Sequence, residues 1–248
     1  MTWFHVQNKM SDFIRKIKRV INTALGRDYC PFCDCWSSFR PFGLVPRGHA
    51  QCPYCGSLER HRFLLNVYQK HIFSSSASCR LLHTAPEEVL VPVFVQKENI
   101  EYVPVDLMPE LFPFVPCVRA DVTELPFEDA SFDWIISNHV LEHIEDEEKC
   151  LAEISRVLKP SGSALLTFPV NWEAEETFED PAIQSPEERL KFYGQEDHVR
   201  AYGKDAVKRL ERFFDVKLLT GRYFKWPNPL KSIIYDAIKC LNLFRRER

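Results

Sequence analysis

The sequence predicts an α/β fold in which a mostly parallel sheet carries helices on both faces and ends in a β-hairpin, with a small cysteine-rich module ahead of it. Short apolar runs alternate with helical patterns over residues 79–220, an order typical of a parallel sheet covered by helices. Four of the nine cysteines form two close pairs before that region. A chain of 248 residues, 45% of them hydrophobic, can bury one full core and a small appendage.

Basic amphipathic helices are predicted at both ends of the chain, within residues 1–28 and 227–248. Each segment carries apolar side chains at helical spacing, with lysines or arginines among or after them. Such helices dock on their own domain or lie on an anionic membrane surface. We expect docking, and peripheral membrane contact is the alternative.

Charge is distributed unevenly along the chain, although the net charge is only -3. Residues 1–72 carry a net charge of +7, residues 73–224 carry -14 and residues 225–248 carry +4. A nucleic acid or an anionic surface would therefore meet the ends first, unless the ends pair with the acidic body. The sequence has no apolar run of about 18 residues and no signal-peptide core, which predicts a cytoplasmic protein.

The two cysteine pairs predict a structural zinc site within a module of residues 29–72. Cys30 and Cys33 form one C-x2-C pair, and Cys52 and Cys55 form a second after eighteen residues. Two such turns can supply four thiolates to one tetrahedral ion. The alternative is four unconnected buried cysteines. A helix is expected to follow from residue 58 to 71, with Ser57 as its N-cap.

A serine-rich linker at residues 74–78 opens the main domain, which we place at residues 73–226. A long helix is expected at residues 146–158, and a capping box at Ser185 to Glu188 opens another. Gly221 separates two runs that predict the terminal hairpin, 216–219 and 222–225. The strands of the parallel sheet are predicted at residues 80–84, 102–105, 117–119, 134–137 and 164–168.

Ligands of such Rossmann-like sheets bind at the carboxyl ends of the strands. The residues that directly follow each predicted strand are therefore the candidates for a cofactor site. Asp106 lies twenty-two residues after Thr84, close to the distance expected for a carboxylate that binds a ribose. The candidates are His83, Ala85, Pro86 and Glu87 after the first strand, Asp106 and Leu107 after the second, Asp121 and Val122 after the third, and Asn138 and His139 after the fourth.

Several motifs then follow in an order that resembles the class I S-adenosylmethionine-dependent methyltransferases of the type 11 branch. They are Asp121, the Leu-Pro-Phe turn at residues 125–127, the strand and loop at 132–143, and the Leu-Lys-Pro-Ser-Gly loop at 158–162. The resemblance spans about residues 79 to 220. Residues 52–62 and 193–200 further resemble a bacterial subgroup that joins cysteine knuckles to such a domain.

The resemblance implies S-adenosylmethionine as cofactor and assigns two carboxylates to it. Asp106 would bind the ribose hydroxyls, and Asp121 with the backbone of Val122 would bind the adenine edge. Both roles suit the chemistry, because a carboxylate accepts from two adjacent hydroxyls and an acceptor beside a donor matches adenine. Taken alone, each aspartate would be interpreted as a turn former or helix cap.

The first loop departs from the family pattern, because no glycine occurs between Gly56 and Gly162. Ala85 and Pro86 must then make the close approach to the cofactor that glycine permits. We expect Glu87 to replace some of the missing contacts, since the cofactor carries an amino group and a sulfonium. An empty site in a domain that only binds a partner is the alternative.

Histidines near the predicted cleft are candidates for activating a methyl acceptor. His143 lies one helical turn after His139 and is the preferred general base by analogy with small-molecule O-methyltransferases, while Asp197 and His198 form a second candidate pair. Residues 171–188 are rich in acids and aromatics and predict an acceptor-binding loop. Its acidity disfavours a nucleic-acid acceptor and suits a neutral or cationic small molecule such as a saccharide, and the analogy with O-methyltransferases implies O-methylation. An RNA methyltransferase whose zinc module holds RNA is a further alternative.

Overall fold

The computed structural model describes residues 17, 20–22, 24–43, 46–219 and 241–246. The chain divides into two compact units, residues 1–68 and 69–248. Most of the predicted N-terminal helix lies outside the described residues, but residues 20–22 and 24 are helical. Within the part of the chain that the structure describes, no helix is long and apolar enough to span a bilayer.

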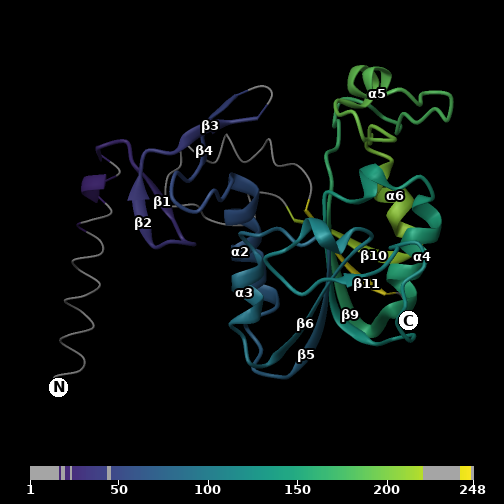
Figure 1. Cartoon of the computed structure of the whole chain (residues 1–248), viewed down its shortest axis with the longest axis horizontal. Helices are drawn as coiled ribbons and strands as arrows, with labels where there is room; N and C mark the ends of the chain where they lie inside the picture. The colour runs from purple at the N-terminus through teal and green to yellow at the C-terminus, as the bar shows by residue number, and fades with distance from the viewer. Residues whose placement is uncertain (1–16, 18–19, 23, 44–45, 220–240, 247–248) are drawn as a thin grey trace. The chain divides into compact units, whose positions relative to one another are not determined.

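The first unit consists of two short antiparallel pairs and the start of a helix (Figure 1). β1 (Asp28–Cys30) pairs with β2 (Cys35–Ser37), and β3 (Arg40–Phe42) pairs with β4 (Arg47–Gln51). Helix α2 (Glu59–His71) follows. Strands of three residues carry no readable alternation, so the sequence did not predict them.

A histidine of the first turn contacts the start of α2. The backbone N–H of Leu58 donates to His61 Nδ1 at 3.1 Å. Ser57, the predicted N-cap, has its Oγ 3.3 Å from both Cys30 Sγ and Cys55 Sγ. The serine hydroxyl therefore contacts the cysteine cluster, and its role as a helix cap stays a prediction.

The second unit is built on a seven-stranded sheet of order β10-β11-β9-β8-β5-β6-β7. Strands β5 to β9 are mutually parallel, and β10 and β11 form an antiparallel pair at one edge. This is the predicted Rossmann-like sheet, and each predicted parallel strand overlaps an observed one. The strands are β5 (Cys79–Thr84), β6 (Ile100–Asp106), β7 (Val118–Arg119), β8 (Phe132–Asn138), β9 (Leu158–Thr167), β10 (Phe214–Leu219) and β11 (Leu241–Arg246).

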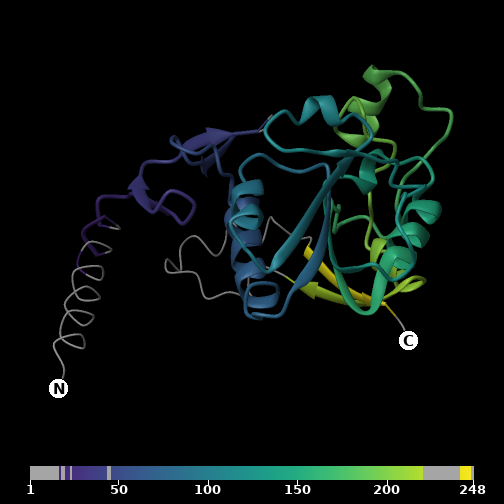
Figure 2. The ribbon, with the colours of Figure 1, turned by 60° about the horizontal axis from the view of Figure 1, so that its bottom comes forward.

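Helices lie on both sides of this sheet, with α3 on one side and α4 and α6 on the other (Figures 1 and 2). Asp146 Oδ1 accepts from Lys149 N at 3.0 Å and caps α4, and Ser185 Oγ accepts from Glu188 N at 3.3 Å and caps α5. Both helix starts therefore lie where the sequence predicts them. The helices are α3 (Val91–Val95), α4 (Glu147–Val157), α5 (Pro186–Tyr193) and α6 (Ala206–Glu211), with 3-10 turns η1 (Pro109–Leu111) and η2 (Leu141–His143).

The C-terminal prediction needs correction. The terminal hairpin exists, but β10 pairs with β11 at residues 241–246 instead of with 222–225, which lie outside the described residues. The end of the predicted helix 227–248 is therefore a strand. β11 also pairs with β9, so it satisfies backbone groups of two neighbouring strands. That tertiary pairing outweighs the helical spacing of the segment.

The core of the second unit lies where its central strands pass between the helical layers. Leu81 and Leu82 of β5 and Ile135 and Ile136 of β8 are fully buried. Both faces of these strands are covered, which explains their continuous apolar runs. Each such side chain stabilises the fold by about 1.5–3 kcal/mol, and together they fix the strand ends.

Candidate active site and cysteine cluster

The strand register brings the predicted cofactor residues to one edge of the sheet. Thr84 pairs with Val105 on one side and with Ser137 on the other, so β5, β6 and β8 end at the same level. The chain proceeds from β5 to β6 and β7 in one direction and then returns to place β8 on the other flank of β5. The crevice at such a topological switch point is where open α/β sheets bind ligands.

Asp106 and Asp121 both stand at this edge, and both form turns. Asp106 Oδ1 accepts from Met108 N at 2.8 Å. Asp121 Oδ1 accepts from Thr123 N at 2.8 Å and from its hydroxyl at 2.7 Å, and these bonds lower the pKa of Asp121. The turn-forming role considered from the sequence is therefore present. Each aspartate uses one oxygen for it, so the second oxygen can serve a ligand.

The side chains next to these aspartates differ in exposure. Leu107 is 57% exposed, whereas Val122 is buried in the core. Arg156 fixes the loop after Asp121, because its guanidinium donates to the carbonyls of Leu125 and Phe127 at 2.9 and 2.8 Å. The Leu-Pro-Phe turn that the sequence singled out is thus held by the end of α4.

The glycine-free first loop adopts the backbone that glycine usually supplies. Ala85 has a φ of +48° and donates its N–H to Val105 O at 3.0 Å. Pro86 is buried, and Glu87 Oε2 accepts from Asn138 Nδ2 at 3.1 Å. Asn138 in turn accepts from Thr167 Oγ1 at 3.1 Å. The Glu87 carboxylate of the first loop is therefore hydrogen-bonded to Asn138 at the end of β8, on the other side of the switch point.

His83 does not lie at the predicted site. Its side chain is fully buried beside Phe94 and Tyr102, and its Nδ1 lies 2.9 Å from the Tyr102 hydroxyl. Burial lowers the pKa of His83 to about 4. The alternation of β5 directs this residue into the core while Thr84 ends the strand, so His83 is a neutral core histidine.

The histidine candidates come together around a carboxylate to which the sequence assigned no role. The ligand atoms of Glu142, His143 and His198 lie within 4.8 Å of one another. The rings of His143 and His198 meet edge to face, with centroids 4.8 Å apart. Asp197 contacts His143 Nδ1 through Oδ2 at 3.2 Å, and Glu142 Oε1 lies 3.0 Å from His139 Nδ1. All the predicted catalytic residues therefore belong to one group.

Residues 197–200 reach this group because they are bound to the loop after β8. Val199 N donates to Glu142 O at 2.9 Å. Arg200 is 4% exposed and donates to the carbonyls of Leu141, Ile144 and Glu145 at 2.9, 2.6 and 2.9 Å. A buried guanidinium that donates to three carbonyls holds residues 197–200 against the loop after β8.

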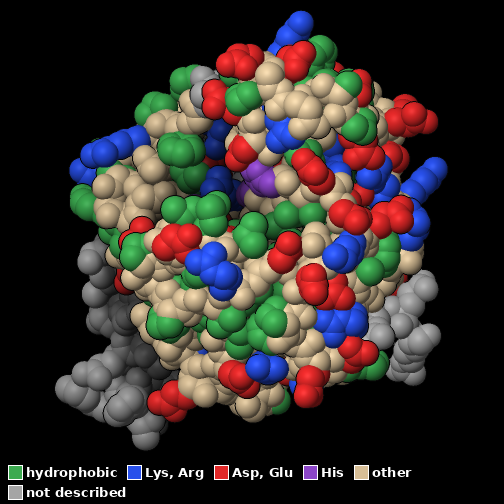
Figure 3. Space-filling model, turned by 45° about the vertical axis from the view of Figure 1, so that its right-hand side comes forward, with side chains coloured by type: hydrophobic (Ala, Val, Ile, Leu, Met, Phe, Trp, Pro, Cys, Tyr) green, Lys and Arg blue, Asp and Glu red, His purple; other side chains and the backbone are tan. Residues whose placement is uncertain are grey.

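His139 has a φ of +53°, a left-handed conformation that costs a non-glycine residue about 1–2 kcal/mol. Strain of this kind persists where the surroundings hold the residue, often beside functional sites. Figure 3 shows a histidine side chain inside a hollow on a face with many acidic side chains. A cavity of about 590 Å³ lies between the start of α4 and the segment after β9. Its lining includes Glu145, Glu179, Asp180, Arg189, Arg200 and Arg209.

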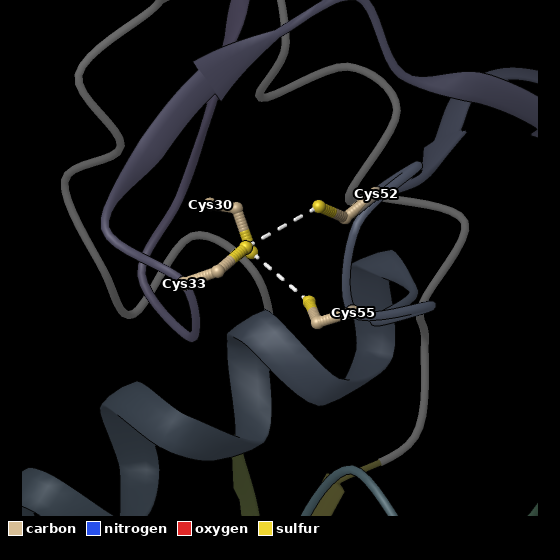
Figure 4. Close-up of side chains that lie close together, drawn as sticks. All are labelled: Cys30, Cys33, Cys52 and Cys55. Carbon is tan, nitrogen blue, oxygen red and sulfur yellow. Dashed lines mark hydrogen bonds between the residues drawn. The ribbon is translucent and has the colours of Figure 1, made fainter.

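The four predicted zinc ligands converge in the first unit (Figure 4). All four sulfur atoms lie within 4.8 Å of one another, with Cys30 to Cys55 at 3.5 Å and Cys33 to Cys52 at 3.6 Å. The residue after each pair is left-handed, with φ +48° at Asp34 and +71° at Gly56. These tight turns direct both thiols of each pair inward.

A fifth cysteine, Cys35, has its Sγ 3.5 Å from Cys33 Sγ and does not belong to the set of four. The thiols oppose one another's ionisation. Burial raises the pKa of Cys30, but hydrogen bonds from Ser57 and from the Cys33 backbone more than offset it and lower the value to about 7. Burial and the neighbouring thiols raise the pKa of Cys33. A divalent cation would remove this opposition, because it stabilises all four thiolates together.

Part of the chain is similar to a known family of protein domains. Residues 76–166 match a family model described as a methyltransferase domain. This segment contains the strand ends after β5, β6, β7 and β8. Over this segment, the chain is similar to a methyltransferase domain.

Curated relatives match over part of their length. A "probable S-adenosylmethionine-dependent methyltransferase" of Mycobacterium tuberculosis is 36% identical over 58 residues, which cover 23% of this chain and 21% of the relative. A 2-phytyl-1,4-naphtoquinone methyltransferase of Nostoc punctiforme is 32% identical over 96 residues, covering 39% of this chain and 34% of the relative. The chain thus spans between a fifth and a third of the length of these two relatives.

Among solved structures, the cyclase SpnF aligns with a TM-score of 0.53 at 14% identity, covering 93% of each chain. At this identity the likeness concerns the fold alone. A fold shared with a protein named a cyclase does not by itself specify the reaction, so the reaction must be argued from the site.

Sequence reasoning missed Glu142 and Arg200 as parts of the site. Both lie within the segments 132–143 and 193–200, which carry the resemblance to methyltransferases. Their spacing in the sequence does not show that they are buried. A charged residue in the middle of an otherwise apolar run was the available signal for Glu142, since buried charges need partners.

Proposed function

We propose that the chain is an S-adenosylmethionine-dependent methyltransferase that methylates an oxygen of a small molecule or saccharide. The observation that carries the proposal is the alignment of Asp106, Asp121 and Asn138 at one edge of the sheet, beside the switch point, within the matched methyltransferase segment. Adenosine needs paired acceptors at this position, and the two aspartates supply them.

The proposed cofactor contacts divide among three strand ends. Asp106 accepts from the two ribose hydroxyls, with Leu107 beside it, and Asp121 with the backbone of Val122 binds the adenine edge. Ala85, Pro86 and Glu87 face the methionine part, where the Glu87 carboxylate pairs with the amino group. Its bond to Asn138 supports this role, because it holds the carboxylate at the switch point. His139 contributes through its left-handed backbone next to Asn138.

Methyl transfer in this site is an in-line displacement. The acceptor oxygen forms a bond to the methyl carbon while the bond between that carbon and sulfur breaks. The electron pair of the broken bond remains on sulfur, which gives S-adenosylhomocysteine. The acceptor proton must leave as the new bond forms. We assign activation of the hydroxyl to the group of Glu142, His143 and His198, with Asp197 orienting the His143 ring.

The acceptor class follows from the lining of the cavity beside this group. It combines carboxylates with guanidinium groups, a lining that suits a polar molecule bearing several hydroxyls and disfavours a nucleic acid, whose phosphates the carboxylates would repel. A named quinone methyltransferase among the relatives also supports a small-molecule acceptor.

The cysteine cluster is proposed as a structural zinc site. Cys30, Cys33, Cys52 and Cys55 offer four sulfurs within 4.8 Å, the closed donor set of structural zinc. Bound zinc there would supply folding free energy and leave no coordination position for a substrate.

Isothermal titration of the full chain with S-adenosylhomocysteine tests the cofactor site. Asp106→Ala should weaken binding by about 10- to 100-fold, because hydrogen bonds to a charged group contribute about 1.5–3 kcal/mol. Asp215→Ala removes an exposed carboxylate of β10 and serves as the matched control, with affinity unchanged. Equal affinities for wild type and Asp106→Ala would refute the proposed site.

A further inference from the structure

The buried carboxyl group of Glu142 is not fully satisfied by hydrogen bonds from the described residues. The residue is 1% exposed. Its Oε1 lies near His139, whereas Oε2 is buried and makes no hydrogen bond within the part of the chain that the structure describes. An unsatisfied buried polar atom is unfavourable, and more so when it is charged. The carboxylate therefore points to a ligand.

Two imidazoles complete a donor set around this carboxylate. His143 Nδ1 faces Asp197, and His198 Nδ1 lies 3.3 Å from Tyr193 O. The Nδ1 atoms of both rings thus lie near oxygen acceptors, an arrangement in which the Nε2 atoms would serve a ligand. Metal-binding histidines are typically arranged in this way, with the second nitrogen donating to a carbonyl or carboxylate.

We propose that Glu142, His143 and His198 bind a divalent transition metal ion. Their donor atoms lie within 4.8 Å of one another, and two imidazoles with one carboxylate form a set that holds zinc or ferrous iron while leaving coordination positions open. The backbone bond from Val199 to Glu142 and the burial of His198 hold the set in place.

This site differs in kind from the cysteine cluster. Four thiolates close the coordination shell of one ion, whereas the Glu142 set leaves room for an oxygen of the acceptor. That use of the ion deepens the proposed methyltransferase function and rests on it, because a cation stabilises the alkoxide that attacks the methyl group. Metal binding itself does not depend on the function. The competing arrangement is a metal-free group in which His143 is the base.

Cobalt(II) titration of the full chain under reducing conditions separates the two sites. Cobalt bound to thiolates gives an intense sulfur-to-metal charge-transfer band, and cobalt bound to nitrogen and oxygen does not. We expect wild type to bind two equivalents, with the charge-transfer band complete after one. His143→Asn should weaken the second equivalent by at least about 100-fold, and Asp197→Asn, which alters only a ring partner, by about tenfold.

Two further variants keep the test decisive. Glu142→Gln preserves the shape of the buried side chain and should also lose the second equivalent, while His49→Asn, outside both groups, should keep it. Circular dichroism checks the fold of each variant. A single equivalent in wild type, or a second equivalent whose affinity His143→Asn leaves unchanged, would overturn the proposal.

S-adenosylhomocysteine binding in the same samples distinguishes the two proposals. Cofactor binding with no second cobalt would refute the metal site alone. A second cobalt without cofactor binding would refute the methyltransferase function alone.

Discussion

The two compact units differ in what holds them together. In the first unit, a buried cluster consists of Cys30, Phe39 and Cys52, and the strands around it are three to five residues long. In the second unit, a continuous buried cluster extends from Leu82 to Phe214 across five strands, the helices α4 and α6 and the 3-10 turn η2. A core as small as the first supplies little stability by itself. With the zinc site proposed above, the first unit depends on a bound ion for its stability, whereas the second depends on its apolar core.

The largest expected effect is loss of the cysteine cluster. Cys52→Ser combined with Cys55→Ser should unfold residues 28–57, because binding of a structural zinc ion contributes about 10–16 kcal/mol in small modules. Hydrogen exchange should show lost protection there and unchanged protection in β5 and β8. S-adenosylhomocysteine binding should persist. Loss of protection in both units would contradict the contrast drawn above.

The next effect concerns acid stability of the second unit through His83. The pKa of this buried residue is lowered to about 4 from 6.5. Between these pH values the unfolded chain binds a proton that the folded chain does not, so stability is complete above about pH 6.5 and declines as pH falls towards 4. The loss is about 3 kcal/mol at 1.36 kcal/mol per pKa unit.

His83→Phe should remove this part of the pH dependence, since a phenyl ring does not titrate. Urea unfolding of both proteins at pH 7 and pH 5 measures it. Parallel pH profiles for wild type and variant would show that His83 is not the titrating group.

A smaller effect is expected at Gly203, in the segment that returns to the site. A Cβ at this position would meet the backbone carbonyl of Glu176. Gly203→Ala should therefore cost about 1–3 kcal/mol, the usual range for overpacking. Thermal unfolding measures the loss, and Gly48→Ala, where a Cβ meets nothing within 4 Å, is the control. Equal melting temperatures for the two variants would argue against tight packing here.

The smallest effect is expected at Ala85. Its φ of +48° strains an alanine, and Ala85→Gly relieves the strain at the cost of a more flexible unfolded chain. The two contributions, about 1–2 kcal/mol and 0.5–1 kcal/mol, leave a net gain in stability between about 0 and 1.5 kcal/mol. Denaturant unfolding with several repeats resolves it. A clear loss of stability would mean that the alanine methyl group contributes packing.

The sequence predicted the elements whose information is local. The spacing of Cys30, Cys33, Cys52 and Cys55 and the caps at Asp146 and Ser185 each depend on a few neighbouring residues. The β11 strand depends on pairing with β9, and its own residues carry a helical spacing as well. Tertiary pairing of that kind is not encoded in a short window of sequence.

The site shows the same division. Asp106, Asp121 and Asn138 could be predicted because strand ends are readable and parallel strands end together. His83 was predicted at the cofactor site but lies in the core. Side chains alternate between the two faces of β5, and His83 stands one residue before the end of the strand. The group of Glu142, His143 and His198 needed the fold, since 54 residues separate His143 from Asp197 and only the return of the later segment brings them together.

Arg200 has a consequence for how the site works. Its guanidinium ties the carbonyls of the loop after β8 to Glu179 in the segment beyond β9. The segments that carry His143 and His198, which lie far apart in the sequence, are thereby held by the same guanidinium. A displacement of one histidine would therefore be transmitted to the other through Arg200, which would preserve the separation between the two imidazoles.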